Sequence, residues 1–243
     1  MAVVAILSVV QSIFGMGVLV FGTPILLLMG YDFITTLSYL LPASFSISLL
    51  QVLTAGPGRV PISKSLYLLC LPGIGVGLWF AGSIWLESWI NFLIGVTLLL
   101  SSLVRFWPPL LRPLRHILEK HFQTYHLIMG LIHGLTNLGG AMLAILAGGT
   151  NTEKEAIRYM VAHYYLAFST IQLFLLAIVM EQHNVLITNL PIAGVSAVIY
   201  LSVGNRLFTR ANNSSFNFAM TIFMALFGFV VVLNFFGQKI AAG

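Results

Sequence analysis

Glycines and short polar side chains interrupt two long apolar segments of this chain. Polar groups inside such segments are costly in a bilayer, so they tend to face a cavity or a partner. Two half-helices that meet at a break leave backbone N–H groups and the positive ends of helix dipoles free, which suits a small anion. We therefore expect a substrate-binding site made of Gly15, Gly17, Thr23, Thr136, Asn137, Gly139 and Gly140.

Close packing of helices is the competing explanation for glycines in apolar segments, because a missing side chain lets two backbones approach each other. We favour this structural role for a second set of small residues, which lie away from the two breaks. That set is Gly73, Gly75, Gly77, Ala81 and Gly194.

Two other apolar segments carry matching stripes of polar side chains. Residues at i, i+4 and i+7 fall on one face of a helix. The stripes are Ser44, Ser48 and Gln51 in the first half of the chain, and Tyr165, Ser169 and Gln172 in the second. Each stripe could line a transport pathway or form hydrogen bonds between helices. Their repetition slightly favours a shared pathway.

His133 and His163 are the ionisable residues that we expect well inside the membrane. A histidine there could carry a proton coupled to transport, or it could be a neutral structural group. Four bases are expected near the membrane edges, where such residues usually orient helices, although one could attract an anion. They are Arg59, Lys64, Arg158 and Arg206.

Catalytic motifs are missing from the sequence. It contains no His-Glu-x-x-His, no Gly-x-x-x-x-Gly-Lys-Ser/Thr and no Gly-x-Ser-x-Gly pattern, so zinc, nucleotide and serine-nucleophile chemistry are not indicated. We expect no enzymatic activity, no metal site and no cofactor.

The amino-acid composition indicates that most of the protein surface faces lipid and not water. Of 243 residues, 59% are hydrophobic and only 7% are charged, and the mean hydropathy is +1.00. A soluble domain carries about 25% charged residues. The net charge of +5 could suggest nucleic acid, but the bases fall in short loops between apolar segments. The composition predicts a multi-pass, all-α membrane protein that does not bind nucleic acid.

Charged and turn residues divide the chain into two halves joined by a basic linker, 107–123. We predict a first repeat over 1–106 and a second over 124–243. Each would contain one broken hairpin and three transmembrane helices. The predicted elements are a hairpin at 2–30 with helices 33–55, 65–86 and 88–106, then a hairpin at 124–149 with helices 157–180, 185–204 and 215–236.

Short matches in the same order support the repeat. Leu71-Pro72-Gly73 corresponds to Leu190-Pro191-Ile192, and Asn91-Phe92 corresponds to Asn217-Phe218. The basic loops share the cytoplasmic side only if the glycine-broken segments enter the membrane and return, because short cytoplasmic loops collect Lys and Arg. Three crossings in each half then make the halves inverted. The alternative is that each broken segment is a long, kinked, tilted span.

These residues resemble the TauE/SafE sulfite exporter family over essentially the whole chain. The resemblance rests on Gly15-Met16-Gly17 followed by Thr23-Pro24-Ile25-Leu26-Leu27-Leu28-Met29-Gly30, on Asn137-Leu138-Gly139-Gly140, and on the segment from Pro191 to Gly204-Asn205-Arg206-Leu207. The first cluster lacks the consecutive glycines usual in the family. The resemblance implies a transporter of the cytoplasmic membrane that moves sulfite or organosulfonates, usually outward.

We therefore expect a secondary transporter that exports a small sulfur-containing anion by alternating access between inverted halves. Its partners would be this anion, the lipid bilayer and a candidate coupling ion. The competing functions are a carrier or channel for another small organic anion, and a membrane scaffold or assembly factor. The sequence leaves the substrate, the coupling ion and the oligomeric state open.

Overall fold

Every element in the described part of the chain is a helix. The computed structural model describes residues 2–81, 92, 95, 96, 98–100, 102, 103, 106, 107 and 120–241. Four helical segments are long and apolar enough to cross a bilayer, namely Phe33–Leu53, Lys154–Val179, His183–Arg210 and Asn213–Leu233. The protein is an all-α polytopic membrane protein, as its composition predicts.

The helices follow one another in two series, separated by residues that are mostly outside the described part. The first series is α1 (Ala2–Phe14), α2 (Val18–Leu28), α3 (Phe33–Leu53), the π-helical turn η1 (Leu66–Cys70) and α4 (Leu71–Ala81). The second is α7 (Phe122–Thr136), α8 (Gly139–Thr150), α9 (Lys154–Phe174), η2 (Leu175–Val179), α10 (His183–Ile199), η3 (Tyr200–Gly204), α11 (Asn205–Arg210) and α12 (Asn213–Ala241). Most of predicted helix 88–106, the end of 65–86 and most of linker 107–123 lie outside the described residues.

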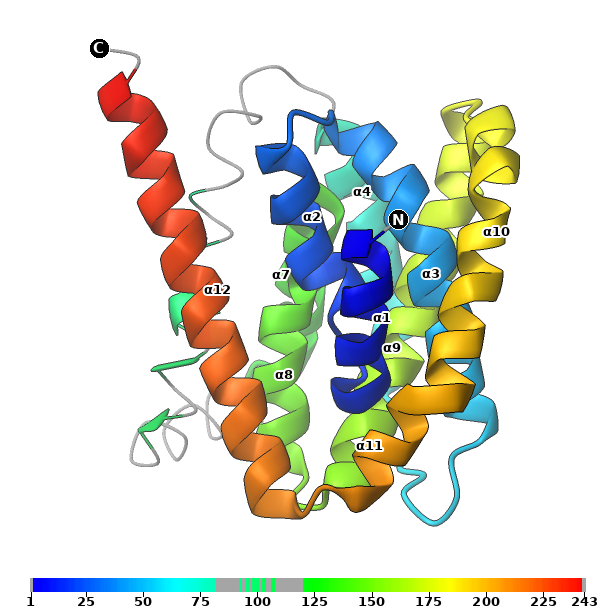
Figure 1. Ribbon diagram of the computed structural model, residues 1–243, viewed down its shortest axis with the longest axis vertical. Helices are drawn as coiled ribbons and strands as arrows, with labels where there is room; N and C mark the ends of the chain where they lie inside the picture. Colours follow the sequence, from blue (N-terminus) through cyan, green and yellow to red (C-terminus); the bar gives the residue numbers. More distant parts are fainter. Residues whose placement is uncertain are drawn as a thin grey trace.

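Helices α1 and α2 fold back on each other. Gly17 lies against Gln11, and Gly22 lies against Leu7, so residue numbers rise along one helix as they fall along the other. In Figure 1, α1 runs towards the lower end and α2 returns towards the upper end. With 13 residues, α1 is about 20 Å long, which is too short to cross about 30 Å of hydrocarbon.

Helices α7 and α8 also fold back on each other, and this hairpin points in the opposite direction to the first. Gly139 lies against His133, and the Tyr125 hydroxyl donates to the Met142 carbonyl at 2.7 Å. Gly73 and Gly77 of α4 contact the backbone of α7 in rising order, so these two helices are parallel. Because α4 runs towards the upper end of Figure 1, α7 rises as well and α8 descends.

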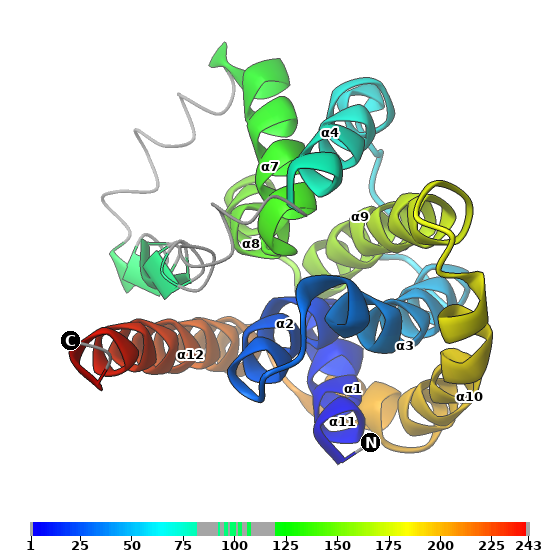
Figure 2. The same cartoon turned by 90° about the horizontal axis from the view of Figure 1, so that it is seen from above.

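Each half lends one helix to the hairpin of the other half. Helix α4 packs against α7, and α10 with η3 packs against α1 and α3, as Figure 2 shows from above. The Ser8 hydroxyl donates to the Ser196 hydroxyl at 2.9 Å, and Gly204 lies against Ser12. The two hairpins are therefore held by contacts between residues distant in sequence.

Only some of the small residues expected to pack helices together lie against a neighbouring helix. A Cβ at Gly73 or Gly77 would meet the backbone of α7, so close packing explains both glycines. Gly75 makes only an ordinary contact with Leu175 at 3.8 Å. Gly194 has no atom within 4 Å of such a Cβ, so the packing explanation is wrong there.

We expect Gly77→Ala to destabilise the protein by about 1–3 kcal/mol, because the new methyl group would collide with the Leu131 carbonyl and force α4 away from α7. Gly194→Ala is the matched control, and it should leave stability unchanged or raise it slightly. Thermal unfolding of both variants in detergent measures this difference. Equal midpoints for Gly77→Ala and the wild type would contradict the packing role.

Basic connections gather at one end of the molecule. The loop after α3, the α8–α9 connection and α11 all lie at the lower end in Figure 1 and carry Arg59, Lys64, Lys154 and Arg206. At the other end, the Asp32 carboxylate accepts from the Thr35 N–H at 2.9 Å and caps α3. Partial burial raises the pKa of Asp32, but the hydrogen bonds from Thr35 and from the backbone N–H groups of Asp32 and Ile34 together outweigh it and hold the pKa below its ordinary value.

Candidate functional site

The first break ends α1 with a left-handed residue. Gly15 has φ +80°, and its N–H donates to the Gln11 carbonyl at 2.8 Å. A Cβ at this position would lie 3.0 Å from the Arg158 carbonyl of α9 and 3.2 Å from Val161. Glycine is therefore required twice, by the backbone conformation and by the close approach of α9.

Gln11 holds the two half-helices of this break together. Its side-chain amide donates to the hydroxyls of Ser44 and Ser48 at 3.0 and 3.1 Å, while its Oε1 accepts from the Val18 N–H at 3.1 Å. The Gln51 amide donates to the carbonyls of Gln11 and Ser12 at 2.9 and 3.0 Å. The polar stripe of α3 thus satisfies the free backbone groups of the broken helix.

The second break is built in the same way around Asn137. This residue has φ +63°, and its N–H donates to the His133 carbonyl at 2.7 Å. Its side-chain amide donates to the Thr23 hydroxyl of α2 at 2.8 Å, and its Oδ1 accepts from the Gln172 amide at 3.3 Å. Asparagine is one of the few residues that adopt the left-handed conformation readily. It also connects the two hairpins directly.

Two fully buried polar atoms beside the second break have no hydrogen-bond partner. They are His133 Nδ1 and the Tyr165 hydroxyl. The other ring nitrogen of His133 is 3.2 Å from Gln172 Oε1, and the rings of His133 and Tyr165 meet edge to face at 6.0 Å. A Cβ at Gly140 would collide with the Tyr165 hydroxyl, so this hydroxyl lies beside the first turn of α8. Because His133 Nε2 donates to the Gln172 oxygen, Nδ1 of the neutral ring is an acceptor, and the Tyr165 hydroxyl is the free donor. A buried donor without a partner is costly, and an anion would satisfy it.

One comparison with known proteins bears on this arrangement. The family model described as sulfite exporter TauE/SafE matches residues 1–231 of the 243. The chain belongs to the TauE/SafE family. No curated protein and no solved structure matches it. The family is described as one of sulfite exporters, which are membrane transporters, and this chain shares that transporter class.

In this TauE/SafE protein, the predicted site residues separate into two groups. The breaks and the side chains in contact with them contain Gly15, Gly17, Thr23, Asn137, Gly139 and Gly140, with Ser44, Ser48, Gln51, Tyr165, Gln172 and His133. The Ser169 hydroxyl instead donates to the Tyr165 carbonyl of its own helix at 2.7 Å. The Thr136 hydroxyl donates to the Ile132 carbonyl of its own helix at 2.6 Å and also accepts from the Leu138 N–H in the second break at 3.3 Å.

His163 lies apart from both breaks. Its Nε2 is 2.8 Å from the Tyr67 hydroxyl, at a groove of about 410 Å³ between η1 and α9. Tyr67 and Phe174, which also line this groove, are exposed. His163 therefore faces the outside of the helix bundle, and we do not include it in the candidate site.

Gln11 was not predicted from the sequence, and Arg158 was expected at a membrane edge and not buried beside the first break. Gln11 is buried at the centre of the first break, and Arg158 is nine-tenths buried with its guanidinium 3.4 Å from the Phe208 ring centroid. The signal for Gln11 was available, because it precedes Gly15 by four residues as His133 precedes Asn137. Nothing in the local sequence of Arg158 separates it from a base at the membrane surface.

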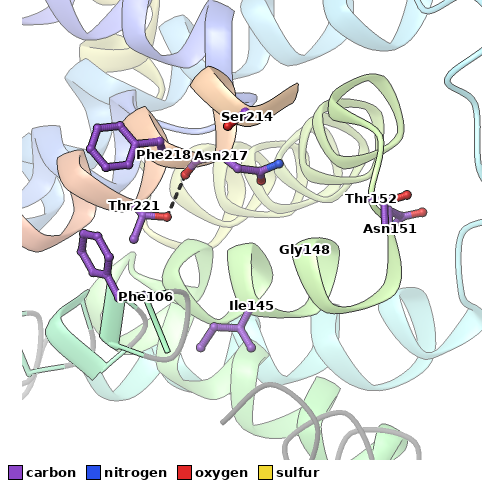
Figure 3. Close-up of a pocket in the computed structure, with 9 residues that line it drawn as sticks. All are labelled: Phe106, Ile145, Gly148, Asn151, Thr152, Ser214, Asn217, Phe218 and Thr221. Carbon is purple, nitrogen blue, oxygen red and sulfur yellow. Dashed lines mark hydrogen bonds between the residues drawn. The ribbon is translucent and has the colours of Figure 1, made fainter. Parts of the chain in front are cut away.

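A separate cavity lies elsewhere in the TauE/SafE fold. It has about 460 Å³ and lies between α8, α12 and Phe106, as Figure 3 shows. Amide and hydroxyl groups line it beside Ile145 and Phe218, and none of the predicted site residues does. The lining residues with polar side chains are Asn151, Thr152, Ser214, Asn217 and Thr221. This cavity opens beside the returning half of the second hairpin.

Proposed function

We propose that this protein is a secondary transporter that exports a small sulfur-containing anion, sulfite or an organosulfonate, by alternating access between two inverted halves. One observation carries the proposal. Two broken helices meet through the buried hydrogen-bonded chain Thr23–Asn137–Gln172–His133, beside an unpartnered Tyr165 hydroxyl. Discontinuous helices joined at the centre of a membrane protein are typical of transporter substrate sites.

The matching geometry of the two breaks supports inverted repeats. In each, a polar residue stands four positions before a left-handed residue and accepts its N–H: Gln11 before Gly15, and His133 before Asn137. The first break is held by Gln51 of α3 and the second by Gln172 of α9. The hairpins point towards opposite ends of the molecule (Figure 1). Two halves that exchange such contacts could open alternately to either side.

Anion binding at the second break would use dipoles and neutral donors. The first backbone N–H groups of α8, a helix of 12 residues, face the break, and the Tyr165 hydroxyl can donate beside them. Fixed donors bind an anion strongly in a site without water. His133 Nδ1 is the position where a coupling proton would be carried.

The positive-inside rule supports an orientation in the cytoplasmic membrane, with the basic lower end inside. The C-terminal helix α12 begins at that end and finishes at the other. We therefore expect a C-terminal alkaline phosphatase fusion to be active and a C-terminal green fluorescent protein fusion to be dark. The reverse pattern would place the basic loops outside and contradict the proposed direction of transport.

Reconstituted vesicles test the transport function. Vesicles loaded with unlabelled sulfite should accumulate radiolabelled sulfite from outside, and the rate should saturate with concentration. Charge movement without saturation would instead indicate a channel. No flux of sulfite, sulfonates or other small organic anions would favour a scaffold and overturn the proposal.

A further inference from the structure

A second small cavity lies at the lower end of α3 and α9, next to the first break. It has a volume of about 50 Å³ and is lined by Gln51 of α3, by the turn containing Gly56 and Gly58, and by Glu155 and Arg158 of α9. A buried water-sized group needs about 10–15 Å³ on this scale. The cavity therefore has room for about four such groups, the size of a small oxyanion.

Arg158 brings a buried positive charge to this cavity, and its direct hydrogen-bond partners are neutral. Its guanidinium donates to Asn205 Oδ1 at 3.2 Å and to the Ser12 carbonyl at 3.4 Å, both neutral acceptors. Among the described residues no carboxylate lies within salt-bridge distance of it. The Glu155 carboxylate lines the same cavity but is partly exposed and pairs with Lys154 at 3.4 Å. A buried cation with only neutral hydrogen-bond partners is unfavourable, so an anion in direct contact with the guanidinium would stabilise it.

Gln51 brings a buried acceptor to the same place. Its amide nitrogen is engaged by the carbonyls of Gln11 and Ser12, which fixes the orientation of the side chain. Its Oε1 is buried and has no donor. Because Arg158 also donates to the Ser12 carbonyl, the two head groups lie around one backbone oxygen. A ligand held there would need an O–H group to satisfy Gln51.

We infer that this cavity is an entry site for a singly charged oxyanion that still carries an O–H group, such as hydrogen sulfite. Arg158 would neutralise the charge, Gln51 Oε1 would accept the O–H, and the Glu155 carboxylate would disfavour a second negative charge. Organosulfonates lack the O–H group and exceed the cavity in size. The inference rests on the proposed function and specifies its substrate.

Binding to the purified protein in detergent tests the site separately from transport. Thermal unfolding is measured at equal concentrations of sulfite, bicarbonate, nitrate and sulfate, since bound ligand stabilises the folded state. Bicarbonate and nitrate share shape and charge but differ in the O–H group. We expect bicarbonate to bind about tenfold more tightly than nitrate, the difference that one hydrogen bond makes, and sulfate to bind least.

Substitutions test which residue is responsible for each part of this anion-binding pattern. Arg158→Gln should abolish stabilisation by all four anions, whereas Arg206→Gln, which removes an exposed charge at the same end, should not. Gln51→Met should remove the preference for bicarbonate over nitrate. Glu155→Gln should improve sulfate binding several-fold and keeps a polar side chain of the same size, so it tests the site even if Arg158→Gln does not fold.

Flux of radiolabelled sulfite in vesicles distinguishes failure of the proposed entry site from failure of the proposed transport function. The bicarbonate preference with no flux of any anion would support the site and overturn the proposed function. Saturable sulfite flux together with equal binding of bicarbonate and nitrate would support the function and overturn the site. An unchanged anion pattern in Glu155→Gln and Gln51→Met would also overturn it.

Discussion

Asn137→Leu should reduce anion flux about 100-fold, the loss that a displacement of about 1 Å in a preorganised site can cause. Leucine cannot donate to Thr23 or accept from Gln172, so both buried partners lose a hydrogen bond. It must also adopt φ near +63°, which costs about 1–2 kcal/mol for a residue with a Cβ. The substitution therefore removes the link between the two hairpins and also disturbs the backbone conformation of the break.

Asn137→Gly separates these two effects. Glycine adopts the left-handed conformation without strain, so this variant should fold and reach the membrane at normal levels. It should still lose flux, because the amide that joins α2 to α9 is gone. Asn184→Leu removes an exposed amide from α10 and is the control. Wild-type flux in Asn137→Gly would remove the second break from the proposed site.

The second large effect is expected at Gly140, in the first turn of α8. An alanine methyl group would collide with the Tyr165 hydroxyl and approach Val20 Cγ2 to 2.5 Å. We expect Gly140→Ala to abolish sulfite flux and to lower stability by about 1–3 kcal/mol, since overpacking of a buried site forces neighbours to move. Vesicle flux and thermal unfolding in detergent are the two measurements.

Removing the hydroxyl from this contact distinguishes packing from binding. The double variant Gly140→Ala/Tyr165→Phe should recover only part of the stability, because the colliding oxygen is absent but Val20 Cγ2 and the ring carbon Cζ still crowd the methyl group. It should not recover flux, because the free donor is lost. Gly75→Ala, where the nearest atom is 3.8 Å away, is the glycine control. Full flux in the double variant would show that Tyr165 only fills space.

Helix positions were largely predictable from the sequence. The segment predicted at 33–55 is α3 over Phe33–Leu53, and that predicted at 215–236 lies within α12. The prediction at 185–204 ended early, because α10, η3 and α11 continue to Arg210. Long apolar runs leave no alternative to a helix in a bilayer, whereas their ends depend on local capping.

Polar stripes identified the right helices but not the role of each residue. Spacing at i, i+4 and i+7 places three side chains on one face, and Ser44, Ser48 and Gln51 all reach the first break or the chain that forms it. On α9, Gln172 reaches Asn137, yet the Ser169 hydroxyl bonds to its own helix. A hydroxyl in an apolar segment can always return to the preceding turn, which spacing cannot reveal.

The sequence by itself determined the membrane class, the two breaks and the pairing of stripes, because these follow from composition, glycine and helical period. Only the tertiary structure decided that Thr23 meets Asn137 across 114 residues, that Gln11 joins the first break, and that Arg158 is buried over Phe208. Such contacts arise when each half packs its helices against the hairpin of the other. Packing between distant segments leaves no local pattern in the chain, and it is this packing that assembles the site.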